Sequence, residues 1–226
     1  GGEKAGILRE GTPLVLGEPD PPDSIMKEVN SLRVPIKAVG HDFPLPEEMD
    51  CSLPAASYAC ARQAAQILDL KLSESQFRDI ASNSRLIGRK TLIDADCKVL
   101  LDVAHNPAAA KFLTDYLKTL NISGDMHALI GIYSDKDISG VISACHGIFK
   151  SWHVTDLPEE RAASADYVAA QIFELDVGEI QAYANIDSAL ETVQRVVEPQ
   201  DLLVVFGSFA TVASAIEHLE KQQDNA

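Results

Sequence analysis

The sequence has no long hydrophobic run. No stretch approaches the roughly 20 apolar residues that cross a bilayer, and the first residues lack the charged-then-apolar order of a signal peptide. Basic residues are also scarce, since 19 Lys and Arg stand against 34 Asp and Glu, a formal net charge of −15. A chain this acidic has no electrostatic attraction for nucleic acid or for an anionic membrane surface. We therefore expect a cytoplasmic protein that binds neither.

Cysteine is rare as well, with 4 residues in 226. None forms a Cys-x-x-Cys pair or lies beside a pair of histidines, which argues against structural zinc and against a redox dithiol. We expect buried or incidental thiols at Cys51, Cys60, Cys97 and Cys145. The remaining composition is that of an ordinary globular protein, 46% hydrophobic and 23% charged, in a chain long enough for one large domain or one and a half smaller ones.

From Lys98 onward, short apolar runs alternate with segments of helical periodicity, which is typical of a parallel sheet covered by helices. The predicted strands are Val99–Val103, Ala128–Tyr133, Ile148–Val154 and Leu202–Phe206. The last strand shows no polar alternation, as expected for a central strand buried on both faces. We predict an α/β fold with a mostly parallel sheet that has helices on both faces.

Three helices are predicted between or after these strands. Asn106-Pro107 supplies an N-cap and a proline for the first helical position of one of them. The residues predicted to face inward are Phe112, Leu113, Tyr116, Leu117 and Leu120 in the first helix, Ile138, Val141, Ile142 and Cys145 in the second, and Val212, Ile216 and Leu219 in the third. Because each helix follows a strand, ligand-binding groups should collect at the carboxyl ends of the strands.

The first 43 residues predict a single βαβ unit, with strands Leu14–Leu16 and Ile36–Val39 joined by a helix that Asp23 caps. That helix would bury Ile25, Val29 and Leu32. One such unit cannot bury its sheet, so we interpret residues 1–43 as the end of a larger α/β domain.

The next segment predicts a loop followed by two helices. The Pro- and acid-rich residues 44–52 form the expected loop. The helices are Tyr58–Leu68 and Ser73–Ala81, and the second opens with the capping-box pattern Ser73…Gln76.

The strongest local signal for chemistry is the segment 101–107, Leu-Asp-Val-Ala-His-Asn-Pro, where a strand ends and a helix begins. A carboxylate at Asp102, an imidazole at His105 and free backbone N–H groups at a helix N-terminus could bind a nucleotide or a substrate carboxylate. The alternative is that both side chains only satisfy hydrogen bonds of the turn.

Five short motifs resemble, in order, those of the dihydrofolate synthase/folylpolyglutamate synthase family, within the Mur-ligase superfamily. They are Glu3-Lys4-Ala5-Gly6-Ile7, Gly88-Arg89, Asp102-Val103-Ala104-His105-Asn106-Pro107, Asp135-Lys136-Asp137 and Gly207-Ser208-Phe209-Ala210-Thr211-Val212-Ala213. The resemblance implies ATP- and Mg²⁺-dependent addition of L-glutamate to dihydropteroate or folate polyglutamates through an acyl phosphate, with a P-loop ATPase domain as the partner of the Rossmann-like domain. The chemistry would be in-line phosphoryl transfer, which depends on positioning and charge neutralisation.

The resemblance also assigns roles to single residues. Arg89 is similar to the family arginine that reaches the ATP phosphates, and a guanidinium can bind phosphate oxygens in a bidentate way. Asp102 resembles the aspartate that contacts the nucleotide, and Ser57 stands where the family has a nucleotide-contacting asparagine. His105 and Ser208, each in a strand-to-helix turn, resemble the groups that meet the incoming glutamate.

Lys4 is similar to the family lysine that becomes carbamylated and then serves as a metal ligand. The alternative, which we favour for this sequence, is an unmodified exposed lysine, because the other metal ligands of the family are expected upstream.

Several departures limit the resemblance. No Gly-x-x-x-x-Gly-Lys-Ser/Thr phosphate loop occurs in the sequence, and the segment from Phe43 to Pro54 is shorter than the family equivalent. Ser57 replaces asparagine, Ile87 replaces proline and Ala210 replaces histidine.

Two interpretations follow. In the first, residues 1–86 are the end of an ATPase domain with connecting helices and residues 87–226 are the Rossmann-like ligase domain, inactive without the phosphate loop. In the second, the chain is a non-catalytic nucleotide- or glutamate-binding or interaction module that kept the fold.

Overall fold

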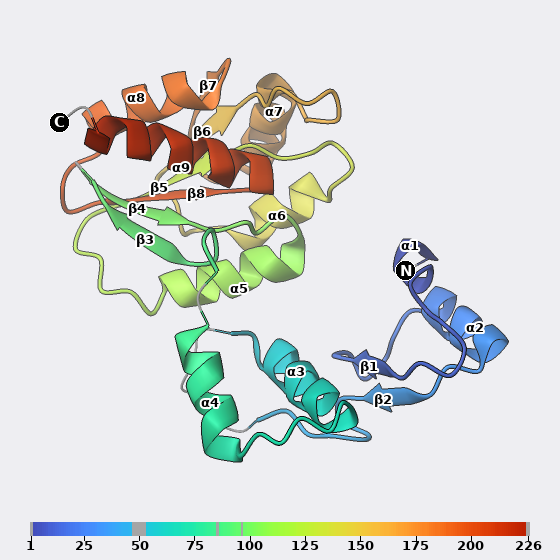
Figure 1. Cartoon of the computed structure of the whole chain (residues 1–226). Coiled ribbons are helices and arrows are strands. Elements are labelled where there is room, and N and C mark those ends of the chain that lie inside the picture. The colour runs from blue at the N-terminus through green and yellow to red at the C-terminus, as the bar shows by residue number, and fades with distance from the viewer. Residues whose placement is uncertain (1, 47–52, 85, 96, 225–226) are drawn as a thin grey trace. The chain divides into compact units, whose positions relative to one another are not determined.

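The computed structural model describes residues 2–46, 53–84, 86–95 and 97–224. Its contacts divide the chain into two compact units, Gly1–Ser84 and Arg85–Ala226, called unit 1 and unit 2 below. Figure 1 shows the secondary-structure elements of both units. Across the described ranges, none of the helices combines the length and the apolar character that crossing a bilayer requires.

Unit 2 is built on a six-stranded sheet with the strand order β3-β4-β8-β5-β6-β7. The strands are β3 (Thr91–Asp94), β4 (Lys98–Leu101), β5 (Met126–Ile130), β6 (Ser151–Thr155), β7 (Glu179–Tyr183) and β8 (Leu202–Phe206). Only the β3–β4 pair is antiparallel, and all the other neighbours are parallel. The predicted mostly parallel sheet is therefore confirmed.

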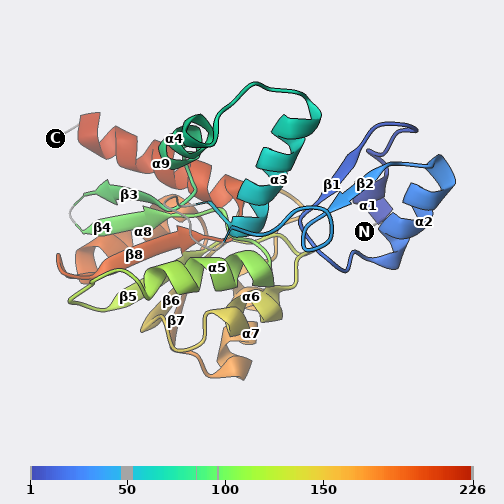
Figure 2. The ribbon, with the colours of Figure 1, turned by 90° about the horizontal axis from the view of Figure 1, so that it is seen from below.

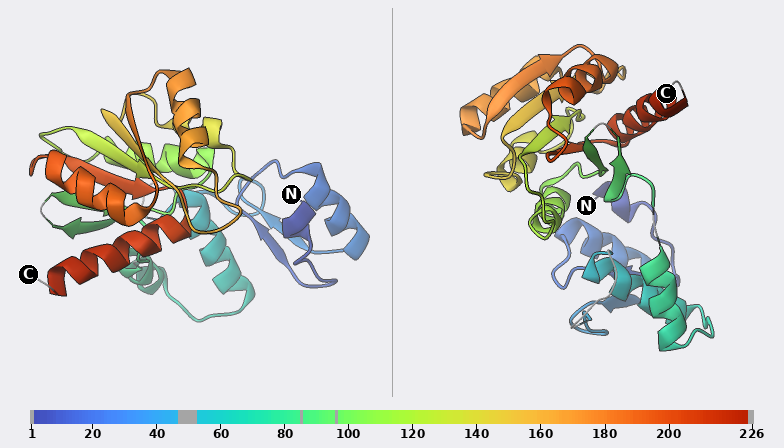
Figure 3. Two further views of the ribbon diagram at one scale, coloured as in Figure 1. Left: turned by 90° about the horizontal axis from the view of Figure 1, so that it is seen from above. Right: turned by 90° about the vertical axis from the view of Figure 1, so that its left-hand side faces the viewer.

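Helices cover both faces of this sheet. On one face lie α5 (Pro107–Leu117), α6 (Ile138–Ala144) and α7 (Ala165–Leu175), as Figure 2 shows. On the other face lie α8 (Ile186–Val196) and α9 (Phe209–Asp224), which are in front in the left view of Figure 3. Two hydrophobic clusters, one on each face, form the core of the unit.

Strand β8 lies at the centre of this arrangement and contributes to both clusters. All five of its side chains are fully buried. Leu202, Val204 and Phe206 pack into the cluster under α5–α7, whereas Leu203 and Val205 pack into the cluster under α8 and α9. This two-sided burial explains why the strand is continuously apolar and confirms its predicted central position.

Some details of unit 2 differ from the sequence-based expectations. Helix α5 buries Ala110, Leu113, Thr114 and Leu117. Tyr116 and Leu120 are half-buried against the core, as predicted, whereas Phe112 is exposed. The Lys90 ammonium makes cation–π contacts with the rings of Phe112 and Tyr116, and its Nζ atom lies 3.6 and 4.6 Å from their centroids.

The sequence also misplaced the start of one strand and did not indicate four of the elements. Ile148 and Phe149 precede β6, which begins only at Ser151. Neither edge strand, β3 or β7, was predicted, and α7 and α8 were missed as well. Edge strands bury only one side or neither, so they lack the long apolar run that indicates a central strand.

Unit 1 contains a parallel pair of strands, with helices on both sides. Its elements are α1 (Gly2–Ala5), β1 (Leu14–Leu16), α2 (Asp23–Leu32), β2 (Ile36–Ala38), α3 (Ala55–Ile67) and α4 (Glu74–Asn83). Strand β1 pairs with β2 in the register Leu14 with Ile36. The cores are small: one cluster joins α1 and α2 to the strands, and a second joins Val39, Phe43 and Ala59.

The helix caps of unit 1 test two predictions. The capping box of α4 is confirmed, because Gln76 N donates to Ser73 Oγ at 3.2 Å and Ser73 N donates to Gln76 Oε1 at 2.9 Å. Asp23 is not the cap of α2: Pro22 is the N-cap residue, and Asp23 is the first helical residue, without a capping hydrogen bond. Helix α3 begins at Ala55, three residues before the predicted start. Of the predicted loop 44–52, residues 47–52 lie outside the described residues.

The cysteines that the structure describes are free thiols, as expected. Cys97 and Cys145 are buried, Cys60 is half-buried, and Cys51 lies outside the described residues. Burial raises the pKa of the Cys145 thiol to about 12, so this group is an unreactive part of the core.

A chain of buried polar side chains crosses β5, β6 and β7 on the α8–α9 face of the sheet. His127 Nε2 lies 3.3 Å from Asp201 Oδ2, and its Nδ1 lies 2.7 Å from Ser151 Oγ. Ser151 Oγ is also 2.9 Å from His153 Nε2, and His153 Nδ1 is 2.9 Å from the Tyr183 hydroxyl. Each buried polar group is thereby hydrogen-bonded within the fold.

The buried His153 in this hydrogen-bonded row predicts that the protein loses stability in weak acid. Burial, together with the nearby His127, lowers the pKa of His153 from 6.5 to about 4. Between these two values the unfolded chain binds more protons than the native one, so the stability that His153 contributes is lost as the pH falls through this window. We expect His153→Gln to reduce the loss of unfolding free energy between pH 7 and pH 4.5 by about 1–3 kcal/mol. Urea titrations of both proteins at the two pH values measure this difference. An equal loss of unfolding free energy in the wild-type protein and in the variant would contradict the role given to His153.

Candidate functional site

The first candidate group is Asp102, which directly follows β4. Its carboxylate is 5% exposed and bridges two segments: Oδ2 accepts from Lys90 N at 3.0 Å, and Oδ1 accepts from Ala104 N at 2.9 Å. Burial raises the pKa of the Asp102 carboxyl, although both backbone N–H groups and the charges of Arg89 and Lys90 oppose this rise. The Asp102 side chain therefore does satisfy hydrogen bonds of the turn, and it retains lone pairs that can accept from a ligand.

His105 lies in the same turn and has a defined tautomer. Its Nδ1 is 2.8 Å from the Val103 carbonyl oxygen, which can only accept, so Nδ1 carries the proton of the neutral ring. The Nε2 atom is left with its lone pair and has no hydrogen-bond partner in the part of the chain that the structure describes. This half-buried imidazole can accept a hydrogen bond or a proton at Nε2.

The Gly88-Arg89 pair is held against the same end of the sheet. Val103 N donates to the Gly88 carbonyl at 2.8 Å, and Gly88 N donates to Thr91 Oγ1 at 3.0 Å. Gly88 has a φ of +78°, and a Cβ at this position would lie 2.9 Å from Val212 Cγ1 of α9. Only glycine fits here, and the close packing presents the next side chain, Arg89, on the surface.

Phe209 joins these groups. It is the first residue of α9 and is 62% exposed. The Arg89 guanidinium carbon lies 6.0 Å from the centroid of its ring, and the His105 ring lies 6.3 Å from it, centroid to centroid. Three separate segments thus place a cation, an imidazole and an exposed aromatic ring together at the carboxyl end of the sheet.

Ser208 directly precedes Phe209, and its hydroxyl is used within the fold. Its side chain is 1% exposed, and its Oγ accepts from Thr211 N at 3.0 Å. The Thr211 hydroxyl donates to the Gly131 carbonyl at 2.6 Å, so the 2.7 Å contact between the two hydroxyl oxygens is a donation from Ser208 to Thr211. The structure gives Ser208 the role of a helix cap, and its contact with a ligand stays a prediction.

A further cation at this edge was not singled out from the sequence. The Arg161 guanidinium carbon lies 3.8 Å from the centroid of the Tyr133 ring. The loops after β5 and β6 that carry these residues are joined by Ser134, whose N and Oγ both donate to the Arg161 carbonyl, at 2.9 and 3.0 Å. Asp137, from the Asp-Lys-Asp motif, caps α6 by accepting from Gly140 N.

Two predicted site residues lie in unit 1. Ser57, in the first turn of α3, is exposed and lines a hollow of about 400 Å³ at the carboxyl end of β1, together with Gly17, Glu18 and Cys60. Lys4 is an exposed residue of the four-residue helix α1.

The described residues do not fit a magnesium site by themselves. Among them, no group of three or more His, Cys, Asp or Glu side chains is arranged to hold a metal ion. An unmodified lysine cannot ligate a hard cation, because its ammonium group has no acceptor.

The predicted residues thus form two sets. Unit 2 brings together Arg89, Asp102, His105 and Ser208, and unit 1 contains Ser57 and Lys4. Sequence reasoning missed Phe209 and Arg161 as candidates. An exposed aromatic ring at a helix start looks like a core residue in a sequence, and an arginine in a loop looks like an ordinary surface charge.

Unit 2 has the architecture of a Rossmann-like α/β domain whose candidate ligand-binding groups lie at the carboxyl ends of parallel strands. The family described as Mur ligase, glutamate ligase domain matches residues 88–209, which is more than half of the chain. The chain therefore belongs to this Mur ligase family.

Individual relatives agree with this assignment. The dihydrofolate synthase/folylpolyglutamate synthase of Escherichia coli is 29% identical over 244 residues, covering 99% of this chain and 56% of the relative. The structure of E. coli FolC in complex with DHPP and ADP has a TM-score of 0.82 and 27% identity, covering 98% of this chain and 56% of that one. A bifunctional folylpolyglutamate synthase/dihydrofolate synthase with Mn, AMPPNP and L-glutamate bound has a TM-score of 0.84 and 28% identity, covering 96% and 56%. The chain spans about half the length of these proteins.

The packing of Gly88 gives a prediction with a built-in control. Gly147 has a similar φ of +73°, but a Cβ there meets nothing within 4 Å, whereas at Gly88 it meets Val212. Gly147→Ala should cost about 1–2 kcal/mol for the left-handed conformation alone. Gly88→Ala should cost a further 1–3 kcal/mol, roughly, because the side chain overpacks the contact with α9. Denaturant titration of both variants measures the two costs, and equal costs would show that the Gly88 contact is not tight.

Proposed function

We propose that this chain is the C-terminal part of an ATP-dependent ligase that adds L-glutamate to dihydropteroate, to folate polyglutamates, or to both, through an acyl phosphate. The observation that carries the proposal is the grouping of Arg89, His105 and Phe209 at the carboxyl edge of a sheet that belongs to the glutamate ligase family. The names of the relatives supply the substrates.

Arg89 and Asp102 are assigned to the nucleotide. Arg89 is exposed and always charged, which suits phosphate oxygens that gain negative charge during phosphoryl transfer. Asp102 has lone pairs left after its two backbone hydrogen bonds, and these can accept from ribose hydroxyls. The Arg89 guanidinium lies over the exposed ring of Phe209, and this cation–π contact helps to position it.

His105 and Ser208 are assigned to glutamate. The free lone pair of His105 Nε2 can accept a hydrogen bond from the amino group and so orient it toward the acyl carbon. Ser208 would act through its helix: the hydroxyl caps α9 and fixes the position of Phe209. The exposed Arg161, over Tyr133, offers a positive charge to a glutamate carboxylate at the same edge of the sheet.

In this proposal, residues 1–86 are the end of a P-loop ATPase domain with its connecting helices, and residues 87–226 are the ligase domain. Ser57 would contact the nucleotide from the hollow at the end of β1. Lys4 is the position that would be modified for metal binding in the family pattern. In the alternative that we favour it is an unmodified lysine, and a preceding ATPase domain, the expected partner, supplies the metal ligands. A bound Mg²⁺ would neutralise phosphate charge, but among the described residues no group of side chains is arranged to hold it. Without a phosphate loop, the chain alone should be inactive, and its expected location is the cytoplasm.

The nucleotide assignment predicts a specific kinetic defect. In the full-length protein that contains this chain, we expect Arg89→Gln to lower kcat/KM for ATP by about 10- to 100-fold, because a phosphate contact of a few kcal/mol is lost. Arg89→Lys should recover part of this loss. Arg195→Gln is the matched control, since Arg195 is an exposed arginine of α8 on the same unit. An Arg89→Gln enzyme with the normal rate would remove Arg89 from the ATP site.

One observation favours the second candidate function, a binding module without catalysis. Three positions depart from the family pattern, at Ser57, Ile87 and Ala210, and Ile87 is 79% exposed. A module of this kind would bind ADP or L-glutamate in a calorimetric titration, and its full-length form would form no amide bond.

A further inference from the structure

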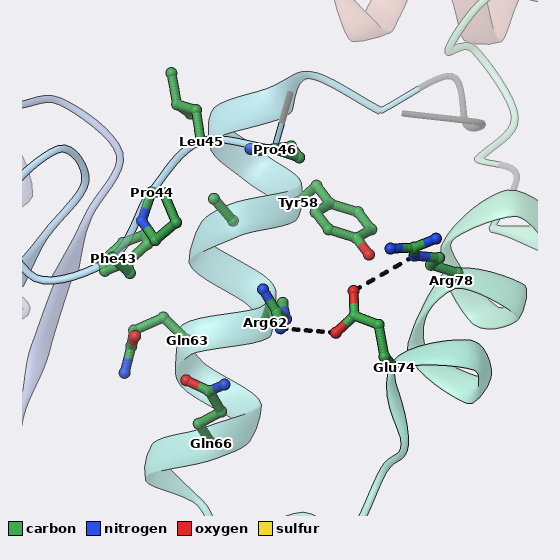
Figure 4. Close-up of a pocket in the computed structure, with 11 residues that line it drawn as sticks. Phe43, Pro44, Leu45, Pro46, Tyr58, Arg62, Gln63, Gln66, Glu74 and Arg78 are labelled. Carbon is green, nitrogen blue, oxygen red and sulfur yellow. Dashed lines mark hydrogen bonds and ion pairs between the residues drawn. The ribbon is translucent and has the colours of Figure 1, made fainter. Parts of the chain in front are cut away.

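Unit 1 contains a cavity that the proposed function does not use. It has a volume of about 460 Å³ and lies between helices α3 and α4 and the segment Phe43–Pro46 (Figure 4). The hollow lined by Ser57 is separate, because the two share no lining residue. A volume within about 300–1,000 Å³ is typical of cavities that bind small molecules.

The charged groups of the cavity leave an excess of positive charge. Glu74, at the start of α4, forms an ion pair through Oε2 with Arg62 Nη2 at 2.7 Å, and its Oε1 accepts a hydrogen bond from Arg78 Nε at 3.4 Å. Both carboxylate oxygens are therefore engaged, as Figure 4 shows. Among the described lining residues, two guanidinium groups against one carboxylate give a net charge of +1, and each guanidinium has further N–H groups beside the one that faces Glu74.

Tyr58 adds a neutral donor and an aromatic surface. Its ring is fixed edge-on against Phe77, with centroids 5.1 Å apart and planes at 82°, and the residue is 6% exposed. In Figure 4 its hydroxyl is directed toward the Glu74–Arg78 pair, yet no hydrogen bond to this hydroxyl exists among the described residues. A phenol oxygen held in this way at a cavity is ready to donate to an acceptor that enters it.

The opposite side of the cavity is apolar. Phe43 is buried, and Pro44, Leu45 and Pro46 continue the wall. A ligand that uses these two sides combines a carboxylate-like acceptor with a flat hydrocarbon body, while the amides of Gln63 and Gln66, which also line the cavity, can hydrogen-bond to polar substituents.

We propose that the cavity between α3 and α4 binds a small aromatic monocarboxylate, with its carboxylate on Arg62, Arg78 and the Tyr58 hydroxyl and its ring against Phe43 and Tyr58. A single negative charge neutralises the local +1, whereas a phosphate dianion would reverse it. A cation is the less suitable ligand, because both oxygens of Glu74 already face arginine nitrogens and the two guanidinium groups repel it. Guanidinium groups are well suited to carboxylates, since their paired N–H groups match the two oxygens.

The test uses the whole chain, with 2-naphthoate as the probe and 2-naphthamide as its neutral counterpart of the same shape. NMR titration should show saturable binding of 2-naphthoate with Kd near or below about 1 mM, and naphthamide binding at least about fivefold more weakly. The Nε–Hε signals of arginine report the site directly, and two of them should shift with the same Kd.

Variants separate this site from general charge effects. Arg62→Gln should weaken naphthoate binding at least about fivefold, and Tyr58→Phe about threefold, because each removes one donor to the carboxylate. Lys27→Gln is the matched control, since it removes one exposed positive charge from α2 of the same unit and should leave Kd unchanged. If Arg62→Gln fails to fold, Tyr58→Phe and the naphthamide comparison still decide the question. Equal affinity for acid and amide, no saturation, or an equal effect of Lys27→Gln would overturn the proposal.

Discussion

The site in unit 2 depends on the burial of β8 on both faces of the sheet. This strand is the neighbour of β4 on one side and of β5 on the other, and all five of its side chains are withdrawn from water. Burying a Leu, Val or Phe side chain stabilises a fold by about 1.5–3 kcal/mol, so this one strand is a large share of the core. The carboxyl ends of β4, β5 and β8 therefore have little freedom to move relative to one another.

The loops that follow these strands are held in place by close contacts between backbone atoms and small residues. Gly207 follows β8 with a φ of +110°, and a Cβ there would lie 2.6 Å from the Gly131 oxygen after β5. The hydroxyl chain from Ser208 through Thr211 to Gly131 then ties the start of α9 to the end of β5. As a result Phe209 is held at the first turn of α9, where its ring contacts Arg89 and His105. The buried position of β8 therefore explains both the close packing at Gly207 and the positions of the candidate site residues.

Most of unit 2 could be predicted from sequence, because its strongest signals are local. Leu202–Phe206 is apolar at every position, and Asn106-Pro107 carries the start signal of a helix. Edge strand β7 escaped prediction because its exposed and half-buried residues, from Glu179 to Tyr183, lack an apolar run. In α5 only Phe112 was misplaced, because it lies on the surface beneath Lys90, a residue distant in sequence.

The candidate site was predictable only in part, for a related reason. Asp102, His105 and Arg89 lie in short motifs that a sequence displays, and their grouping follows from the order of the strands. The buried, hydrogen-bonded state of Ser208 depends on Thr211 and Gly131, which β-sheet pairing brings together. The contact of Phe209 with two site residues, and that of Arg161 with Tyr133, likewise require the folded loops.

We propose that this chain supplies the glutamate-ligase part of an enzyme and that a preceding domain supplies the phosphate-binding part. The most direct measurement is mass spectrometry of products after incubation with ATP, Mg²⁺, L-glutamate and either dihydropteroate or tetrahydrofolate. It should be made on this chain and on the full-length protein that contains it. The account predicts glutamate addition by the full-length protein and none by the chain alone. Turnover by the chain alone, or silence in both proteins, would contradict it.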